Sequence, residues 1–99
     1  MKISVIDTPW QRKLIVEGKL IFPWAAELTT AYESSAADLA GREIVIEIRD
    51  LMAVSQEGEN VLLELMNKGV RFHSSGLFTR QVMKTLARRE RRKLHQASK

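Results

Sequence analysis

The residues best placed to do chemistry follow an apolar strand near the middle of the chain. Ser55 precedes a predicted helix, and Glu57 and Glu59 lie in the first turn of that helix. A serine hydroxyl at this position can accept hydrogen bonds from the free N–H groups of the first turn, and carboxylates complement its partial positive charge. The same groups can contact a partner. We therefore expect the loop from Asp50 to Gly58 to be the working surface.

Catalytic chemistry has little support in the sequence. His73 and His95 are the only histidines, and neither has an acidic residue at a spacing that would orient it. The chain has no cysteine, its carboxylates are dispersed, and its five glycines stand alone at predicted element boundaries. This pattern excludes a thiol nucleophile and lacks a phosphate-binding glycine loop. The sequence predicts a protein that is not an enzyme, with no metal and no cofactor.

The strand that delivers this loop has the sequence REIVIEIRDL. Ile44, Ile46 and Ile48 point to one side of it. Glu43 and Glu47 point to the other side. This alternation is typical of a strand with one buried face and one face in contact with water. We predict a central strand in a sheet whose second face is partly open.

Two apolar runs precede this strand. Ile3 to Ile6 and Arg12 to Leu20 are separated by the turn residues Asp7-Thr8-Pro9. Two such runs on either side of a proline-containing turn predict a β-hairpin. We expect Gly18 to form a bulge or bend, and Trp10 to cover one edge of the core.

Helices alternate with strands in the rest of the chain. A first helix is predicted to open at Phe22-Pro23-Trp24, with proline in its first turn, and to end at Gly41. A second follows the central strand and ends at Gly69. A short strand from Val70 to His73 then leads to Ser74-Ser75-Gly76, which we expect to cap a third helix. The side chains expected to face the core are Trp24, Leu28, Tyr32, Ser35 or Ala36, and Leu39 in the first helix, Val61, Leu62, Leu65 and Met66 in the second, and Phe78, Val82, Met83 and Leu86 in the third.

This order of elements predicts an α/β protein. An initial hairpin followed by parallel crossovers gives a mixed sheet of four to five strands, with the helices mainly on one face. A chain of 99 residues that is 44% hydrophobic is long enough for one domain. We predict that residues 1–88 form this domain. Residues 89–99, which lack apolar periodicity, are predicted to form a basic C-terminal tail, either a frayed helix or a disordered segment.

The net charge of +4 is unevenly distributed. Residues 80–99 contain eight lysines and arginines against one acidic residue, a net +7, whereas residues 1–79 carry a net −3. A terminal charge run is more often a solvated helix end, and the body offers no aromatic platform for bases, so nucleic acid is a disfavoured partner. The cations spaced by four residues, which predict a basic patch along the third helix, are Arg80, Lys84, Arg88 and Arg92.

The sequence also bears on the compartment. No apolar run approaches the ~20 residues of a membrane span. The N-terminal residues lack the long apolar core of a signal peptide. We therefore expect a cytoplasmic protein without membrane insertion.

The chain resembles a STAS domain, the fold of bacterial anti-sigma factor antagonists and of the cytoplasmic modules of sulfate transporters. The resemblance covers about Ile3 to Leu86 and lies in a pattern of elements. An early strand ends near Gly18-Lys19-Leu20, and the strand IVIEIRDL leads to a loop closed by Gly58 and the helix VLLELMNKG. In the regulatory members this loop reads Asp-Ser-Ser/Thr-Gly, and a partner kinase that is itself the anti-sigma factor phosphorylates the first hydroxyl residue.

At that loop the chain departs from the family pattern. Ser55, Gln56, Glu57 and Gly58 occupy it, so the glycine is kept while Gln56 replaces the phosphoacceptor. Glu57 either mimics the phosphorylated state with a permanent charge or only complements the helix dipole, and the second interpretation is favoured. Ser55 is a candidate acceptor only if the register shifts by one residue, and capping is the simpler explanation.

The resemblance implies a non-catalytic regulatory module that is not switched by phosphorylation. Its partner would be an anti-sigma factor with serine kinase character or another STAS protein. Two alternatives stay open: an accessory STAS subunit of a transport complex, and binding of nucleic acid or an acidic surface through the basic helix. A homodimer is a further option. The residues predicted to contact the partner are Asp50, Ser55, Gln56, Glu57, Gly58, Glu59, Asn60 and Leu63.

Overall fold

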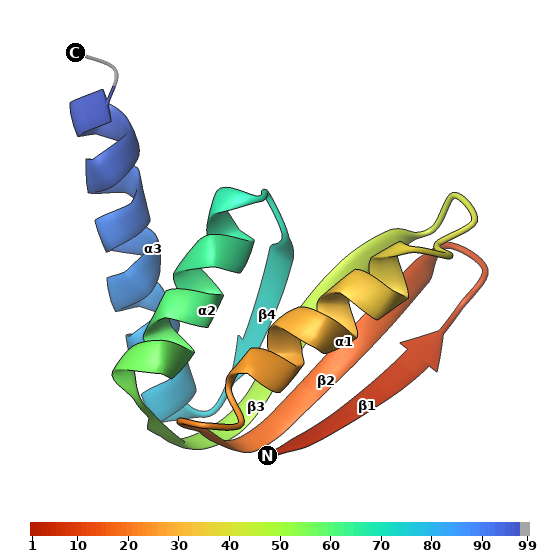
Figure 1. Cartoon of the computed structure of the whole chain (residues 1–99), viewed down its shortest axis with the longest axis horizontal. Helices are drawn as coiled ribbons and strands as arrows, with labels where there is room; N and C mark the ends of the chain where they lie inside the picture. The colour runs from red at the N-terminus through yellow and green to blue at the C-terminus, as the bar shows by residue number, and fades with distance from the viewer. Residues whose placement is uncertain (98–99) are drawn as a thin grey trace.

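The computed structural model describes residues 1–97, with side chains through Arg91, and shows a single α/β domain. Four strands and three helices follow one another in the predicted order (Figure 1). The elements are β1 (Lys2–Asp7), β2 (Gln11–Leu20), α1 (Ala26–Ala36), β3 (Glu43–Val54), α2 (Gln56–Asn67), β4 (Arg71–Ser75) and α3 (Leu77–Ala97).

The sheet is mixed, and its strands lie in the order β1-β2-β3-β4. β1 and β2 form the predicted antiparallel hairpin, and its turn is closed by the Gln11 N–H, which donates to the Thr8 hydroxyl oxygen at 3.0 Å. β2 pairs with β3, and β3 with β4, in parallel. The predicted central position of β3 is therefore confirmed, and the carboxyl ends of three strands meet at one edge of the sheet.

All three helices pack against one face of the sheet, as the sequence predicts. Ile46 and Ile48 of β3 are fully buried on this face. They share one core with Leu28 of α1, Leu62 of α2 and Leu86 of α3. Figure 1 shows α1 and α2 side by side over the strands. Burying these side chains supplies most of the driving force for folding, at roughly 25 cal/mol per Å² of apolar surface.

The opposite face of the sheet carries charged side chains around two buried apolar ones. Ile15 and Val45 are almost fully buried there. Glu47 pairs with the Lys13 ammonium at 3.4 Å and with the Arg49 guanidinium. The hydrogen bond from Arg49 lowers the pKa of the Glu47 carboxyl below its ordinary value. The predicted position of the β3 glutamates, away from the core, is confirmed.

β3 extends further than the sequence suggests because two bulges keep it paired with β2. The pairing steps from Glu17↔Arg49 to Gly18↔Leu51 and then to Lys19↔Ala53, so two β3 residues have no direct partner. The first is Asp50, which adopts a φ of +44°. Gly18 has a φ of +98°, and the predicted bulge there is confirmed. The predicted loop start at Asp50 is wrong, because strand pairing continues to Val54.

Several aromatic residues lie elsewhere than predicted. Trp10 is 78% exposed and does not cover the core. α1 begins at Ala26, after the Phe22-Pro23-Trp24 segment, so Trp24 is not part of the helical stripe. In α3, Phe78 is half exposed, and the next residue, Thr79, is buried instead. The Thr79 hydroxyl oxygen accepts a hydrogen bond from the Leu51 N–H at 2.9 Å, which ties the start of α3 to β3.

The predicted C-terminal glycine is right for α2 and wrong for α1, and the predicted cap of α3 is right only at Gly76. Gly69, with a φ of +82°, follows the C-cap residue of α2. α1 ends at Ala36, and Gly41 lies in a later turn. α3 begins directly after Gly76, whose carbonyl oxygen accepts from the Arg80 N–H at 3.1 Å. Ser74 and Ser75 belong to β4, and no described hydrogen bond joins either hydroxyl to α3, so the serines do not take part in the cap.

α3 continues beyond the body of the domain. Its C-terminal half projects past the other elements in Figure 1. The predicted boundary at residue 88 falls within this helix, and the helix runs to Ala97. Residues 98–99 of the predicted tail lie outside the described residues, and the fraying of the tail stays a prediction.

Candidate functional site

The candidate site lies where the carboxyl ends of β2 and β3 meet the N-terminus of α2. Open α/β sheets bind ligands most often outside the carboxyl ends of their parallel strands. β2 ends at Leu20, which pairs with Val54 at the end of β3. The Ser55 N–H then donates to the Leu20 carbonyl oxygen at 3.1 Å. This bond brings the first turn of α2 directly against the end of β2.

Gly58 makes this close approach possible. A Cβ built on Gly58 would stand 2.1 Å from the Leu20 carbonyl oxygen and 2.9 Å from a methyl carbon of Val54. Both distances are far shorter than van der Waals contact, and the Leu20 oxygen belongs to the backbone of a buried strand end. A side chain at residue 58 would therefore force α2 away from the sheet.

Ser55 is the N-cap of α2, as predicted. Its backbone is extended, with φ −88° and ψ 173°, and its hydroxyl oxygen accepts from the Gly58 N–H at 3.2 Å. The same oxygen also accepts from the Phe22 N–H at 3.0 Å. The hydroxyl therefore satisfies one donor of the helix and one donor of the segment that leads into α1.

Glu57 joins the starts of two helices. It lies in the first turn of α2, and its carboxylate accepts from the Ala26 N–H at the start of α1 at 3.2 Å. A carboxylate near two helix N-termini is stabilised by both partial positive charges. This contact supports the interpretation that Glu57 complements helix N-termini and does not mimic a phosphoryl group. The sequence predicted an interaction of Glu57 with the dipole of α2 alone, and the structure adds the contact with α1.

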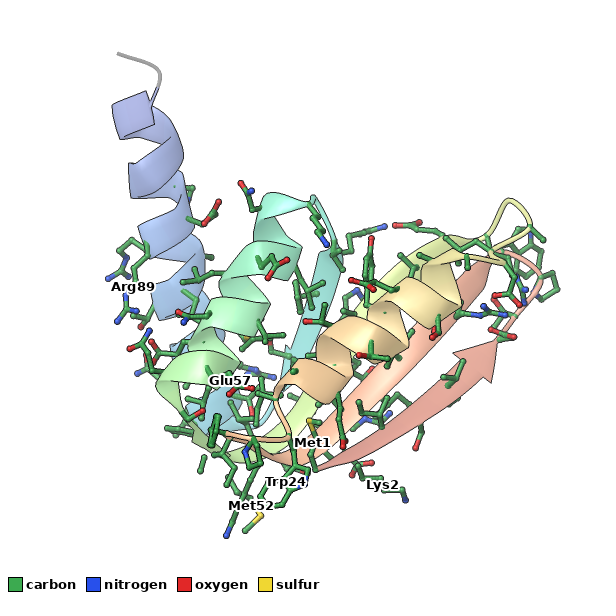
Figure 2. The ribbon with its side chains drawn as sticks, in the orientation of Figure 1. Met1, Lys2, Trp24, Met52, Glu57 and Arg89 are labelled. Atoms are coloured by element: carbon green, nitrogen blue, oxygen red, sulfur yellow. The ribbon has the colours of Figure 1, made fainter. Side chains whose placement is uncertain are left out.

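Around this polar corner, three large apolar side chains face solvent. Phe22 is 70% exposed, Trp24 53% and Met52 70%. Figure 2 shows Trp24 and Met52 projecting at the end of the molecule that holds Glu57. We call Phe22, Trp24 and Met52 the carboxyl-end surface. Exposed aromatic and methionine side chains of this size are typical of protein interfaces.

Sequence reasoning missed this surface for identifiable reasons. The helical spacing of Trp24 with Leu28 indicates a buried residue, but α1 begins two residues after Trp24. Met52 follows an apolar run, which favours a buried position. In the structure Gly18 pairs with Leu51 and Lys19 with Ala53, so Met52 lies between them with no partner on β2. The dipeptide Phe22-Pro23 is a turn signal, and it is the one sequence feature that could have placed Phe22 and Trp24 before the start of the helix.

The residues predicted to contact a partner do not form one continuous patch. Gln56 and Asn60 are exposed and hydrogen-bonded to each other at 3.0 Å. Glu59 faces α3, where it pairs with Arg89 at 3.0 Å. Leu63 is partly buried against the core. Asp50 lies beside Gly76, because a Cβ on that glycine would be 3.2 Å from the Asp50 carboxylate oxygen.

The predicted basic patch is partly described. Arg80, Lys84 and Arg88 are all exposed along α3. The side chain of Arg92 lies outside the described side chains, as does that of His95. His73 is exposed on β4. Within the described residues there is no cluster of three or more His, Cys, Asp or Glu side chains that could hold a metal ion.

Comparison with known proteins adds no assignment. No family model, curated protein or solved structure matches this chain. Among the residues that the structure describes, no helix is both long enough and apolar enough to span a membrane.

Proposed function

We propose that this chain is a non-catalytic regulatory module of the STAS type that binds a partner protein through its carboxyl-end surface. The partner is an anti-sigma factor with serine kinase character, or another STAS protein. Binding centres on Trp24 together with Phe22 and Met52, and the exposed amides of Gln56 and Asn60 add polar contacts.

The observation that carries the proposal is the exposure of Phe22, Trp24 and Met52 beside a polar corner whose hydrogen bonds are already satisfied. Tryptophan in particular is enriched among the residues that dominate binding energy, because it buries a large area with little loss of conformational freedom. Exposure of the apolar side chains of Phe22, Trp24 and Met52 to water has a free-energy cost, which a bound partner would remove.

The element order is consistent with the STAS resemblance. A hairpin leads into a parallel β2-β3-β4 arrangement, and a glycine, Gly58, lies in the first turn of the helix that follows β3. The close contact between Gly58 and Leu20 gives a packing reason for a glycine at that position. This contact supports the proposal at one position of the pattern, Gly58.

The geometry of the corner favours a module without a phosphorylation switch. Gln56 has no hydroxyl, and the Ser55 oxygen already accepts two backbone N–H groups. A phosphoryl group on Ser55 would have to displace at least one of them. The carboxylate of Glu57 is also engaged, by the Ala26 N–H. We therefore expect constitutive binding.

Site-specific photocrosslinking tests the surface. A photoreactive phenylalanine analogue is placed at Met52 in one variant and, as a matched control, at the exposed Glu33 near the C-terminal end of α1 in another. Each is illuminated with a purified anti-sigma kinase from the same genome. We expect a crosslink from residue 52 and none from residue 33, and a Trp24→Ala variant should lose at least about tenfold in affinity.

Incubation of the same mixture with labelled ATP tests the absence of a switch. We expect no label on this chain. Label on Ser55 would contradict the unswitched module, while equal crosslinking from both positions would contradict the surface. If a transport ATPase crosslinks from residue 52 and the kinase does not, the accessory-subunit alternative replaces the kinase partner.

A further inference from the structure

A second surface lies at the far edge of the sheet. β4 is the last strand in the order β1-β2-β3-β4, so one of its edges has no strand beside it among the described residues. A groove of about 760 Å³ runs between β4 and α3. We call it the β4 groove. Its apolar wall includes Val70, Phe72 and Met83, and its basic rim consists of Arg80, Lys84 and Arg91.

The rim of the β4 groove carries uncompensated positive charge. Arg80, Lys84 and Arg91 are exposed, and within the described residues no ion pair joins any of them to a carboxylate. By contrast, Arg89 on another side of the helix is paired with Glu59. Glu90, the single acidic residue among the described lining residues, is only 9% exposed. The groove is therefore complementary to a negatively charged, partly apolar ligand.

We propose that the β4 groove binds an acidic segment of a partner protein in extended conformation, which adds a fifth strand to the sheet beside β4. An open strand edge presents backbone N–H and C=O groups that a peptide can pair with, and a neighbouring groove selects its side chains. This surface is separate from the carboxyl-end surface, and the proposal does not depend on the partner assigned there.

The spacing of the rim fits such a segment. Arg80 and Arg91 are eleven residues apart on α3, a rise of about 16 Å along a helix. Residues i and i+4 of a strand point to the same face and lie about 13 Å apart. A segment with acidic residues at i and i+4 and an apolar residue at i+2 can therefore place two carboxylates near the rim and one apolar side chain near Phe72.

Binding of synthetic peptides tests the proposal. The probes are fluorescein-labelled peptides with glutamate, leucine or phenylalanine, and glutamate at alternate positions and threonine between them. Their affinity for the full chain is measured by fluorescence anisotropy. We expect binding that weakens as salt is added. A peptide with lysine in place of glutamate should not bind. A peptide N-methylated on alternate amides, which keeps the side chains but removes strand pairing, should lose at least about tenfold in affinity.

Charge-reversal variants locate the site. Arg80→Glu and Lys84→Glu should each lower the affinity by at least about tenfold, because each replaces an attraction at the rim by a repulsion. Arg88→Glu is the matched control: it makes the same change of charge on an exposed residue of the same helix that does not line the groove. It should change the affinity by less than about threefold. Circular dichroism of each variant verifies that the helices remain folded.

Several outcomes would overturn the proposal. If no peptide of the set binds, the groove does not take an acidic extended segment. If the N-methylated peptide binds equally well, or if the bound peptide is helical by circular dichroism, the added strand is excluded. Equal losses in Arg88→Glu and Arg80→Glu would show unspecific attraction to a basic helix. The Trp24→Ala variant should bind the peptides normally, which separates this proposal from the function proposed above.

Discussion

Gly58 at the start of α2 and Leu20 at the end of β2 are packed so closely that no side chain fits between them. A Cβ on Gly58 would stand 2.1 Å from the Leu20 carbonyl oxygen. Gly58 is helical and buried. Glycine is therefore needed at this position because the two backbones approach closely, and not because the backbone is left-handed. The contact holds the Ser55 cap and the carboxyl end of β2 in one fixed arrangement.

Replacing Gly58 by alanine should therefore destabilise the protein. In an open helix the same change would stabilise by up to about 1 kcal/mol, because alanine has the higher helix propensity. Here the overlap with backbone should dominate, and we expect a net loss of about 1–3 kcal/mol in the free energy of unfolding. Urea denaturation measures it. Gln56→Ala, in the same helical turn but exposed, is the control and should stay within about 0.5 kcal/mol. Unchanged or higher stability of Gly58→Ala would contradict the packing.

The double role of the Ser55 hydroxyl predicts a graded series. Ser55→Ala removes the acceptor of both the Gly58 and the Phe22 N–H groups. We expect it to lower the free energy of unfolding by about 1–2 kcal/mol, at the upper end for a helix cap. Ser55→Asp restores an acceptor and should recover most of the loss in thermal or urea denaturation. If Ser55→Ala had no effect, capping could not explain the serine.

The exposed side chains of the carboxyl-end surface should matter little for stability. Phe22→Ser and Met52→Ser change residues that are each 70% exposed, and we expect shifts within about 0.5 kcal/mol of the wild-type unfolding free energy. Leu28→Ala, at a fully buried position of α1, is the contrast and should lose about 2–5 kcal/mol. A large loss in Met52→Ser would show that this residue serves the core and not a partner.

The sequence was sufficient to predict the sheet and its helical face because these depend on local periodicity. The alternation of Ile44, Ile46 and Ile48 with two glutamates specifies which side of β3 is buried, and the structure has the same division. The N-cap role of Ser55 was predictable in the same way, since it depends on residues three positions apart. These features need no knowledge of what lies opposite.

The missed features depend on contacts between segments distant in sequence. The length of β3 follows from bulges that pair Gly18 with Leu51. The second role of Glu57 comes from Ala26, which lies 31 residues away along the chain. Trp24 and Phe78 look like core residues by spacing, and their exposure follows from where α1 and α3 begin. Single-sequence periodicity contains no information on these pairings.

Acid should weaken the end of the domain that holds the hairpin turn. Arg12 donates to both carboxylate oxygens of Asp7, at 2.8 and 3.1 Å, and also contacts Asp38 and the Ser35 carbonyl oxygen of α1. The hydrogen bonds from Arg12 lower the pKa of Asp7 below its ordinary value of 3.8. Folded Asp7 therefore binds a proton less readily than unfolded Asp7. Its contribution to stability is fully present above pH 3.8 and is lost as the pH falls through the lower, folded pKa.

Urea denaturation across this acid range checks the prediction. The wild-type unfolding free energy should fall as the pH drops below 3.8, the ordinary pKa of Asp7, with a further contribution from Glu47, whose pKa is also lowered. Asp7→Asn removes the titrating group, so its curve should start lower near pH 7 and fall less steeply in acid. Glu33→Gln, the same kind of change at an exposed residue of α1, should leave the slope unchanged. Equal slopes for wild type and Asp7→Asn would exclude the Asp7–Arg12 pair as a source of acid sensitivity.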